Sequence, residues 1–540
     1  MSLAAALNTA WLLKSAGPAW LFRRATRRVA EVQTRLLARL VERNRDTDFG
    51  RTHGFRHVRG PRDFQKCVPL SRYEDYGEAV RRIGAGEANV LTAERVRLLE
   101  PTSGTAGGEK LVPYTNTLRR QFQRAVSPWV ADLLWQRPAL RRGRSYWSIS
   151  PALGPPRRTP GGVPVGFDDD TAYLGGLERW ALARLLAVPP SVARLPDVER
   201  FRYATLLHLL RARDLALISV WSPTFLPALL APLEEWHERL CYDLARGTSG
   251  PRGPSRDAQL ITIFRSHLSL PEKLRQVWPG LALISCWADG SAARYLGEVR
   301  ALFPQVEIQP KGLLATEGCV SFPLLGRPAP VLAVRSHFFE FAPADGDDCR
   351  LAHELEVGRR YRVVLTTGGG LYRYELRDEV EVVGFEGQAP LLRFLGKADR
   401  VSDLAGEKLS EPHVRVVLDR LFTDNSLSPR FAMLVPVEGC PPHYRLYVQG
   451  AVEGGALQAG LEEGLSANPY YRHAVALGQL GPVEVQFLPP DGPSAWGVYE
   501  RRCLARGQKL GNIKPAALDT WAGWPEVFRP LTQVHAAHRS

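Results

Sequence analysis

The sequence predicts an α/β protein with a large N-terminal domain and a small C-terminal α+β domain. Strand patterns and helical patterns alternate through most of the 540 residues, and 45% of the residues are hydrophobic, so the chain can bury a substantial core. The last third is richer in strands, and its pattern changes at LGKAD, residues 395–399. This change predicts a domain boundary near 395, with domains at 29–395 and 396–540.

The spacing of apolar residues predicts the individual elements. Residues 29–41 have the helical period, and LLHLLRARDLALISVW at 206–221 predicts a helix that leads into a buried strand. Proline and glycine clusters at 151–166 and 246–254 predict surface loops. In the last third we expect strands at 361–367, 379–385, 445–452 and 483–488, and a helix at 413–422.

The charge of the chain limits its partners. The formal net charge is +14, which favours anionic ligands, lipids or small substrates. Basic residues are scattered, form no run of five, and do not interleave with aromatic residues as a single-strand binding surface requires. We therefore expect no nucleic-acid partner.

The seven cysteines indicate an intracellular protein. They form no CxxC pair and no zinc-site spacing with histidine, so we expect reduced and mostly buried thiols. The cysteines stand at 67, 241, 286, 319, 349, 440 and 503.

The N-terminal segment 1–28 is a candidate membrane anchor. Its first part, MSLAAALNTAWLLKSAGPAWLF, is apolar over about 20 residues, near the length that spans a bilayer. Lys14 and Pro18 interrupt it, and it lacks the preceding basic residues of a cleaved signal peptide. An inserted segment would associate the protein with the endoplasmic reticulum or nuclear envelope. A helix packed on the domain surface, in a cytoplasmic protein, is the alternative.

A glycine- and hydroxyl-rich stretch, TSGTAGG at 102–108, is suited to holding phosphate. It fails the Walker pattern, because Glu109, Lys110 and Leu111 follow where Gly-Lys-Ser/Thr is required. Its glycines still let backbone N–H groups approach an anion, its hydroxyl groups can donate, and a lysine follows. A surface turn is the alternative. The candidate phosphate ligands are Thr102, Ser103, Gly104, Thr105, Gly107, Gly108 and Lys110.

Three further segments supply what a nucleotide site would need. Thr316 and Glu317 follow an apolar run, and Glu317 could hold Mg²⁺ through the phosphates. Asp378, between the two strands expected at 361–367 and 379–385, could accept both hydroxyls of a ribose. Lys514, in GNIKP, could neutralise charge on a phosphate. Taken singly, each is also typical of an ordinary turn or surface position.

The order of these segments resembles the adenylate-forming superfamily and, within it, the Gretchen Hagen three family of acyl acid–amido synthetases. The resemblance runs from about 35 to about 515. The segments that carry it include LLARLVERNRDTDFGRTHGF, IGAGEANVLT, TSGTAGGEKLVP, VWSPTFLPALL, LLATEG, SHFFEFAP and VGRRYRVVLTTGGGLYRYELRDEVEVVGF.

The resemblance implies a luciferase- or acyl-CoA-synthetase-like fold with a mobile C-terminal domain. The loop at 102–108 would cover the ATP phosphates, Thr316 and Glu317 would contact nucleotide and Mg²⁺, and Asp378 would bind the ribose. Lys514 would be catalytic in adenylation, together with Glu317. Lys397 would contact the nucleotide at the start of a hinge whose pivot is Asp399 and Arg400. The candidate acyl-pocket residues are Trp221, Phe225, Trp287 and Tyr295.

The chain departs from the family pattern at several positions. Arg377 replaces a glycine before the ribose-binding aspartate, Lys397 replaces an arginine, and Ala106 replaces a hydroxyl residue. Gly368 and Gly369 replace bulkier residues, which we expect to loosen the turn or open the pocket.

The resemblance implies an ATP-dependent ligase that adenylates a small carboxylic acid and transfers the acyl group to an amine. The departures leave a second function open, a catalytically weakened member that binds nucleotide, ligand or protein as a scaffold. A third is an acyl-CoA ligase-like enzyme with a thiol acceptor. A monomer is expected.

Overall fold

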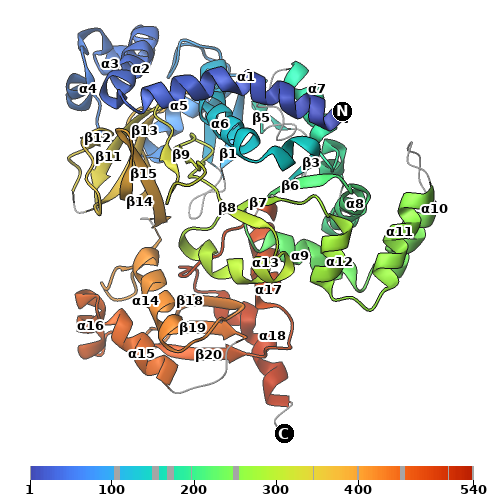
Figure 1. Ribbon diagram of the computed structural model, residues 1–540. Coiled ribbons are helices and arrows are strands. Elements are labelled where there is room, and N and C mark those ends of the chain that lie inside the picture. The colour runs from blue at the N-terminus through green and yellow to red at the C-terminus, as the bar shows by residue number, and fades with distance from the viewer. Residues whose placement is uncertain are drawn as a thin grey trace. The chain divides into compact units, whose positions relative to one another are not determined.

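The computed structural model divides into two compact units (Figure 1). The larger unit comprises Met1–Ala288, Leu296–Leu376 and Val380–Arg393, and the smaller comprises Asp289–Tyr295, Arg377–Glu379 and Phe394–Ser540. The structure describes residues 2–102, 110–148, 157–166, 176–195, 197–246, 254–344, 346–397, 400–450, 456–506, 508 and 510–537.

A parallel sheet in the larger unit has the order β3-β6-β7-β8. Every residue of β6 is buried, which explains why its sequence, LALIS, is apolar almost throughout. The helix α8 (Val198–Arg211) precedes β6, as the sequence predicts. The four strands are β3 (Arg144–Trp147), β6 (Leu215–Ser219), β7 (Leu283–Cys286) and β8 (Glu307–Pro310).

A seven-stranded sheet forms the main core of the larger unit, in the order β12-β11-β13-β14-β15-β10-β9. Alternate residues of β14, among them Val380 and Val382, are buried in the core. The strand expected at 361–367 is confirmed as β13. The strands are β9 (Ser321–Phe322), β10 (Val331–Leu332), β11 (Phe338–Pro343), β12 (Arg350–Leu351), β13 (Arg360–Thr366), β14 (Tyr374–Glu386) and β15 (Ala389–Lys397).

The strand expected at 379–385 begins earlier, at Tyr374, so Asp378 lies within β14 and not between two strands. The prediction was wrong here because Arg377 and Asp378 look like turn residues. Arg377 does have the backbone of a turn, with φ of 57°, but the strand continues on both sides of it.

The glycine-rich loop joins two strands of a smaller sheet with the order β2-β1-β5-β4. The strands β1 (Leu98–Thr102) and β2 (Lys110–Tyr114) are antiparallel, and Thr102 is paired with Lys110. In the predicted surface loop 151–166, residues 157–158 and 164–165 instead form the short strands β4 (Arg157–Arg158) and β5 (Pro164–Val165).

The N-terminal segment forms the helix α1 (Leu3–Ala25), which packs along α6 (Asn116–Gln136) (Figure 1). The buried Asn8 fixes it by donating hydrogen bonds to the carbonyls of Leu140, Arg141 and Gly143 at 3.0–3.3 Å. Among the described residues, no helix has the length and apolar character required to cross a membrane.

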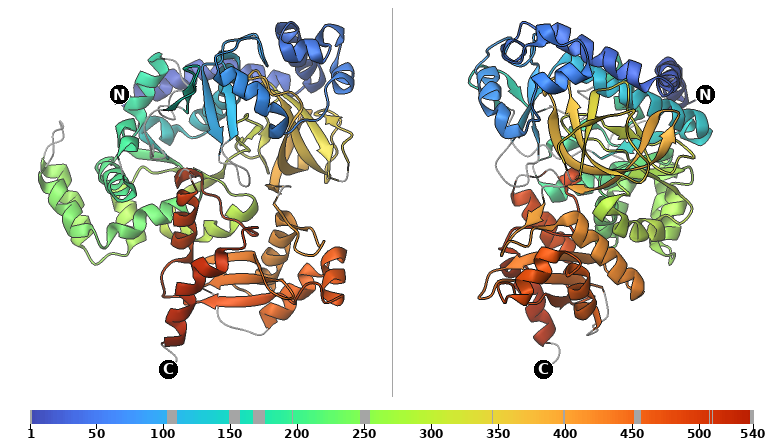
Figure 2. Two further views of the ribbon diagram at one scale, coloured as in Figure 1. Left: turned by 180° about the vertical axis from the view of Figure 1, so that it is seen from behind. Right: turned by 90° about the vertical axis from the view of Figure 1, so that its left-hand side faces the viewer.

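Most of the remaining helices of the larger unit lie around these sheets, whereas the helices at 237–246 and 254–265 pack against each other and project to one side (Figures 1 and 2). The helix expected at 29–41 is confirmed as α2. The remaining helices of the larger unit are α2 (Val29–Asn44), α3 (Asp48–Thr52), α4 (Pro61–Cys67), α5 (Gly77–Gly84), α7 (Gly176–Leu185), α9 (Phe225–Leu230), α10 (His237–Arg246), α11 (Pro254–Arg265), α12 (Leu270–Val277) and α13 (Leu296–Leu302).

The smaller unit is α+β, with helices packed on a three-stranded sheet of order β18-β19-β20. The predicted helix at 413–422 and strands at 445–452 and 483–488 correspond to α14, β19 and β20. Its elements are β16 (Val401–Ser402), β17 (Leu409–Ser410), α14 (Glu411–Asp424), β18 (Phe431–Val437), β19 (His443–Gln449), α15 (Ala456–Leu465), α16 (Pro469–Ala476), β20 (Glu484–Leu488), α17 (Ala495–Ala505) and α18 (Trp524–Ala537).

All seven cysteines are free, and five of them are buried, as the sequence predicts.

Candidate functional site

The carboxyl edge of the parallel sheet gathers three side chains of different chemistry. The N–H of Trp287 donates to the Trp221 carbonyl and that of Lys311 to the Cys286 carbonyl, both at 2.8 Å, so strand pairing continues past the strand ends. Ligands of α/β proteins bind at this edge of a parallel sheet. Trp221, Trp287 and Lys311 are therefore a candidate ligand-binding group, which we call the sheet-edge cluster.

Lys311 is the functional candidate that the sequence reasoning missed. Its Nζ donates to Ser219 Oγ at 2.7 Å and lies 5.0 Å from the Trp221 ring centroid. Among the described residues no carboxylate lies within ion-pair distance of this ammonium group. Burial lowers the pKa of Lys311 to about 8. Its position directly after the strand β8, in QPKGLLATEG, is the sequence signal that could have identified it.

Thr316 and Glu317 occupy the tip of a tight turn that follows β8. The backbone groups of Ala315 and Gly318 exchange hydrogen bonds at 3.0 and 3.2 Å, and Leu314 bridges to Cys319. This pairing leaves only two residues at the tip, and both are partly exposed. Thr316 and Glu317 are therefore partly accessible at the tip of the turn.

A buried histidine holds the base of this turn. The Cys319 N–H donates to His337 Nε2 at 3.1 Å, so His337 accepts through that nitrogen. Burial lowers the pKa of His337 to about 3, and the ring is neutral at physiological pH. Gly318 has no room for a side chain, because its Cβ would lie 2.8 Å from His337 Nε2. The sequence interpretation did not single out His337.

The Tyr374 hydroxyl donates to Glu317 Oε1 at 3.4 Å and helps to hold the carboxylate in place. A single carboxylate with remaining oxygen lone pairs suits Mg²⁺, which uses one or two protein carboxylates and shares phosphate oxygens. Within the described residues no group of three or more His, Cys, Asp or Glu side chains could hold a metal by itself.

The glycine-rich loop is defined by its two ends, since Ser103, Gly104, Thr105, Ala106, Gly107 and Gly108 lie outside the described residues. Thr102 and Lys110 are paired across β1 and β2. The Lys110 ammonium group lies 5.5 Å from the Tyr73 ring centroid and 3.9 Å from Glu74 Oε1. The hairpin therefore holds the threonine and the lysine side by side at the two ends of the loop.

The smaller unit brings Asp378, Lys397 and Lys514 into one charged cluster. Asp378 is 2% exposed, and Lys397 Nζ lies 2.9 Å from its Oδ1. A carboxylate offers about four acceptor positions, and the Lys397 ammonium group occupies one of them. Asp378 is thus a buried carboxylate with unused acceptor capacity, which suits a ligand hydroxyl.

Lys514 lies within electrostatic range of this carboxylate. Its pKa is lowered to about 8, chiefly by burial and also by Lys397 and Arg400, while Asp378 and Glu411 act in the opposite direction. The hinge residue Arg400 contacts both oxygens of Glu411 at 3.3 Å, and Asp399 lies outside the described residues. Three of the residues predicted from separate motifs, Asp378, Lys397 and Lys514, are therefore brought together by folding.

The predicted acyl-pocket residues fall into different surroundings. The rings of Trp221 and Trp287 have centroids 5.7 Å apart at the sheet edge. Phe225 is 4% exposed within α9. Tyr295 belongs to the smaller unit, where its ring centroid lies 5.8 Å from that of Trp496. Of the four, only Trp221 and Trp287 join the sheet-edge cluster.

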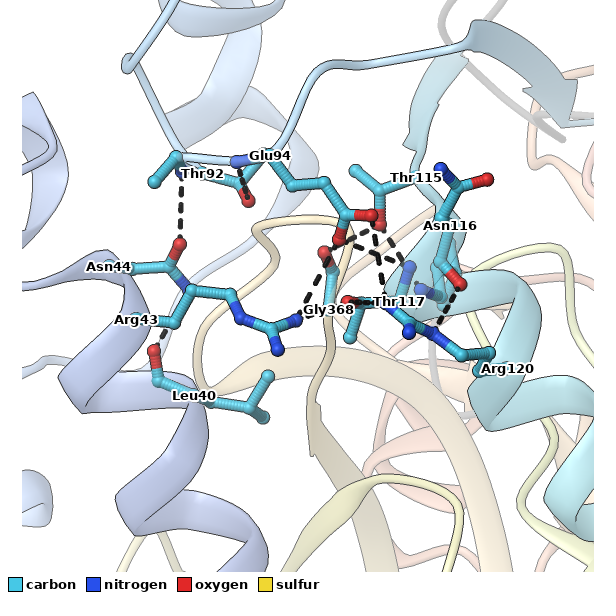
Figure 3. A network of polar contacts seen from close by, with 12 residues as sticks. Leu40, Arg43, Asn44, Thr92, Glu94, Thr115, Asn116, Thr117, Arg120 and Gly368 are labelled. Carbon is cyan, nitrogen blue, oxygen red and sulfur yellow. Dashed lines mark hydrogen bonds and ion pairs between the residues drawn. The ribbon is translucent and has the colours of Figure 1, made fainter.

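The expectation that Gly368 and Gly369 loosen their turn or open a pocket was wrong. A Cβ at Gly368 would lie 2.3 Å from Thr117 Cγ2, and one at Gly369 would lie 2.5 Å from the Pro113 carbonyl oxygen. The Gly368 carbonyl also accepts from Thr115 Oγ1 at 2.8 Å (Figure 3), and its N–H donates to Gln121 Oε1 at 2.8 Å. The two glycines allow close packing, and the space that a side chain would need is filled.

The comparisons with known proteins give this arrangement a family. Models of the N-terminal, central and C-terminal domains of the GH3 (Gretchen Hagen three) family match residues 20–308, 330–397 and 412–520. The chain is 26% identical to indole-3-acetic acid-amido synthetase GH3.8 of Oryza sativa subsp. indica, over 91% of this chain and 88% of that protein. It is 24% identical to indole-3-acetic acid-amido synthetase GH3.10 of Arabidopsis thaliana, over 91% of this chain and 93% of that one.

The solved structure of AtGH3.15 acyl acid amido synthetase in complex with 2,4-DB has the same fold, with a TM-score of 0.84, 20% identity and 96% coverage of both chains. The predicted fold, a large N-terminal α/β part with a smaller C-terminal part, is thereby confirmed. The three family matches together span most of the sequence in the expected order, so the chain belongs to the GH3 family.

Proposed function

We propose that this protein is an ATP-dependent ligase that adenylates a small carboxylic acid and transfers the acyl group to an amine. Its family membership and the amido synthetase names of its relatives support this reaction. The observation that carries the proposal is the charged cluster of Asp378, Lys397 and Lys514. It combines a buried carboxylate that suits ribose hydroxyls with a lysine that can neutralise phosphate charge.

In the first half-reaction, a carboxylate oxygen of the acid attacks the α-phosphorus of ATP, and the bond to the departing pyrophosphate breaks. Lys514 neutralises charge on the phosphate, and Glu317 would hold Mg²⁺, which supplies further charge neutralisation when bound. The loop between Thr102 and Lys110 would donate to the phosphates. Because side chains do little covalent chemistry here, positioning and charge supply most of the rate.

In the second half-reaction, the amine nitrogen attacks the acyl carbon, AMP leaves with the electron pair, and the amine loses a proton. The domain assignment, 29–395 for ATP and acid and 396–540 for the mobile part, belongs to this proposal, as does a hinge at Asp399 and Arg400. Membrane association of residues 1–28 remains a prediction.

The sheet-edge cluster is the acid-binding site in this proposal. Trp221 and Trp287 provide an aromatic surface, and the Lys311 ammonium group provides a cation for the acid's carboxylate.

Replacing Lys311 with methionine keeps much of the side-chain volume and removes the charge. We expect Lys311→Met to raise the KM for the acid about tenfold or more, as expected for the loss of a charged contact, with the KM for ATP unchanged. Equal changes in both constants would contradict this assignment.

The test of the reaction is acid-dependent exchange of labelled pyrophosphate into ATP, measured across a panel of carboxylic acids. Exchange with at least one acid, lost in Lys514→Ala but retained in a control such as Lys273→Ala, supports adenylation. Lys273 lies outside both clusters, in α12. An absence of exchange with all acids, in protein that is folded, would contradict the proposal.

The Lys397–Asp378 ion pair favours a second function, a nucleotide-binding scaffold with little turnover. A lysine 2.9 Å from the proposed ribose acceptor competes with a ligand for that carboxylate. Thermal stabilisation by Mg·ATP without pyrophosphate exchange would support this second function.

A further inference from the structure

A groove in the larger unit has a lining dominated by arginine. Its volume is about 490 Å³, within the range of pockets that hold small molecules. Eight arginines line it, together with one acidic residue, Glu31. The arginines are Arg24, Arg28, Arg35, Arg39, Arg43, Arg120, Arg124 and Arg335.

Two helices, α2 and α6, supply five of the eight arginines. On α2, Arg35, Arg39 and Arg43 follow one another at intervals of four residues and so share one face. On α6, Arg120 and Arg124 also stand four residues apart. No residue of the sheet-edge cluster or of the Thr316–Glu317 turn lines the groove, so it is separate from the candidate active site within this unit.

Two carboxylates are shared among four of the arginines. Glu31 contacts Arg28 and Arg35. Glu94 lies between Arg43 and Arg120, with each guanidinium 3.8 Å from one of its oxygens (Figure 3). These contacts neutralise only part of the positive charge of the walls.

The other four arginines, Arg24, Arg39, Arg124 and Arg335, have no carboxylate within ion-pair distance in the described part of the chain. Burial lowers the pKa of Arg124, and repulsion from Arg39, Arg120 and Arg43 lowers it further. Burial and Arg124 similarly lower the pKa of Arg335. Like charges that face one another in a concave site disfavour the folded chain, and an anion bound between them relieves that repulsion.

We propose that this groove binds a compact anion with several clustered phosphate groups. Guanidinium groups from two helices can bind separate phosphates in bidentate fashion, which a single phosphate or carboxylate could not exploit. Thr117 and Gln121 add a hydroxyl and an amide to the same lining.

Such clustered phosphates occur on free polyphosphorylated molecules and on lipid headgroups. Apolar side chains of α1 stand beside the groove, with Trp20 60% and Leu21 42% exposed, and Leu21 is part of the lining. Exposed Trp and Leu next to a cationic site are typical of helices that lie on anionic membranes. The two sources share the phosphate chemistry and differ in their need for Trp20, which does not line the groove.

The test is isothermal titration of the full chain with inositol hexakisphosphate as the soluble probe. The wild type should bind, and Arg39→Glu/Arg124→Glu should weaken binding at least tenfold. The matched control is Arg59→Glu/Arg360→Glu, which changes two exposed arginines of the same unit outside the groove and should bind like the wild type. Arg39→Gln/Arg124→Gln, which removes charge without reversing it, provides the same comparison if the glutamate variant does not fold.

A second arm measures co-sedimentation with phosphatidylcholine vesicles that contain or lack a phosphoinositide. Phosphoinositide-dependent binding that falls in Trp20→Ala, whose side chain is exposed and does not line the groove, with binding of the soluble probe intact, identifies a headgroup as the source. Binding of the soluble probe alone identifies a free molecule. No binding in either arm, or equal weakening by groove and control variants, would overturn the proposal. The proposal would also be overturned if the groove bound only a long polyanion such as heparin and neither of the two probes.

Discussion

At the scale of single residues, the charge of the Lys514 ammonium group should set the pH dependence of adenylation. Its pKa of about 8 means that it is charged below that pH and neutral above it. We predict that kcat/KM for adenylation falls as the pH rises past about 8, approaching a tenfold loss per unit, because the neutral amine cannot stabilise phosphate charge. An unperturbed lysine would keep its charge to about pH 10.

Initial-rate measurements from pH 6.5 to 9.5 test this prediction, with Lys514→Arg as the comparison because arginine stays charged throughout. The arginine variant should lose the alkaline fall, even if its absolute rate is lower. The same fall in both proteins would assign the titration to another group, such as Lys311, whose pKa is also about 8.

His337 gives a prediction on stability. Its pKa is about 3 in the folded chain and about 6.5 when unfolded, so below pH 6.5 the unfolded state binds more protons. Stability must therefore fall as the pH falls. Between pH 7.5 and 5.5, we expect the wild type to lose about 1.4 kcal/mol more than His337→Gln, whose side chain does not titrate.

Denaturant unfolding followed by tryptophan fluorescence at both pH values provides the measurement. If the free energy of unfolding depends on pH in the same way in the wild type and in His337→Gln, the pKa of the buried ring is not lowered by its surroundings, and the prediction is contradicted.

The backbone conformation of Arg377 explains why the family pattern has a glycine at this position. Its φ of 57° lies in the left-handed region, where a side chain costs roughly 1 kcal/mol or more relative to glycine. We predict that Arg377→Gly is more stable than Arg377→Ala by about 1 kcal/mol, since both lose the arginine side chain and only alanine keeps a Cβ. Thermal unfolding of the two variants compares them directly, and an alanine variant of equal or greater stability would contradict the strain.

At the scale of elements, the turn at Gly368 is held by packing. A Cβ there would overlap Thr117 on α6, so Gly368→Ala should destabilise the larger unit by about 1–3 kcal/mol. Gly297→Ala is the matched control, because no atom lies within 4 Å of the added Cβ and alanine favours the helix α13. Chemical denaturation of both variants checks the contrast, and equal effects would contradict the packing argument.

The elements that the sequence predicted well are those with a strong apolar period. The helix α2 shows the helical period, and the strand β6 is a short apolar run of the length typical of a buried strand. The strand β14 was predicted to begin too late, because Arg377 and Asp378 carry turn-like side chains inside a strand. The role of Gly368 depends on Thr117, which is distant in the sequence, so no local pattern could reveal it.

The same limit applies to the candidate site. Thr316, Glu317, Asp378 and Lys514 stood out through their motifs, whereas Lys311 and His337 did not. The importance of those two residues comes from burial against partners far along the chain, Ser219 and the N–H of Cys319. Such contacts depend on tertiary packing, and a single sequence does not specify them.

At the scale of the whole molecule, the two units divide the proposed machinery. The larger unit holds the sheet-edge cluster and the Glu317 turn, and the smaller unit holds Asp378, Lys397 and Lys514. Adenylation requires both sets of residues. Substitutions in one set should therefore abolish the reaction even when the unit that holds the other set stays folded.

Pyrophosphate exchange is the measurement that tests this account most directly. With a panel of small carboxylic acids, the wild type should exchange labelled pyrophosphate into ATP in an acid-dependent manner. Lys514→Ala and Glu317→Ala should each reduce that exchange by at least a hundredfold without lowering the melting temperature. Exchange that persists in both variants, or that no acid elicits from the folded wild type, would contradict the account.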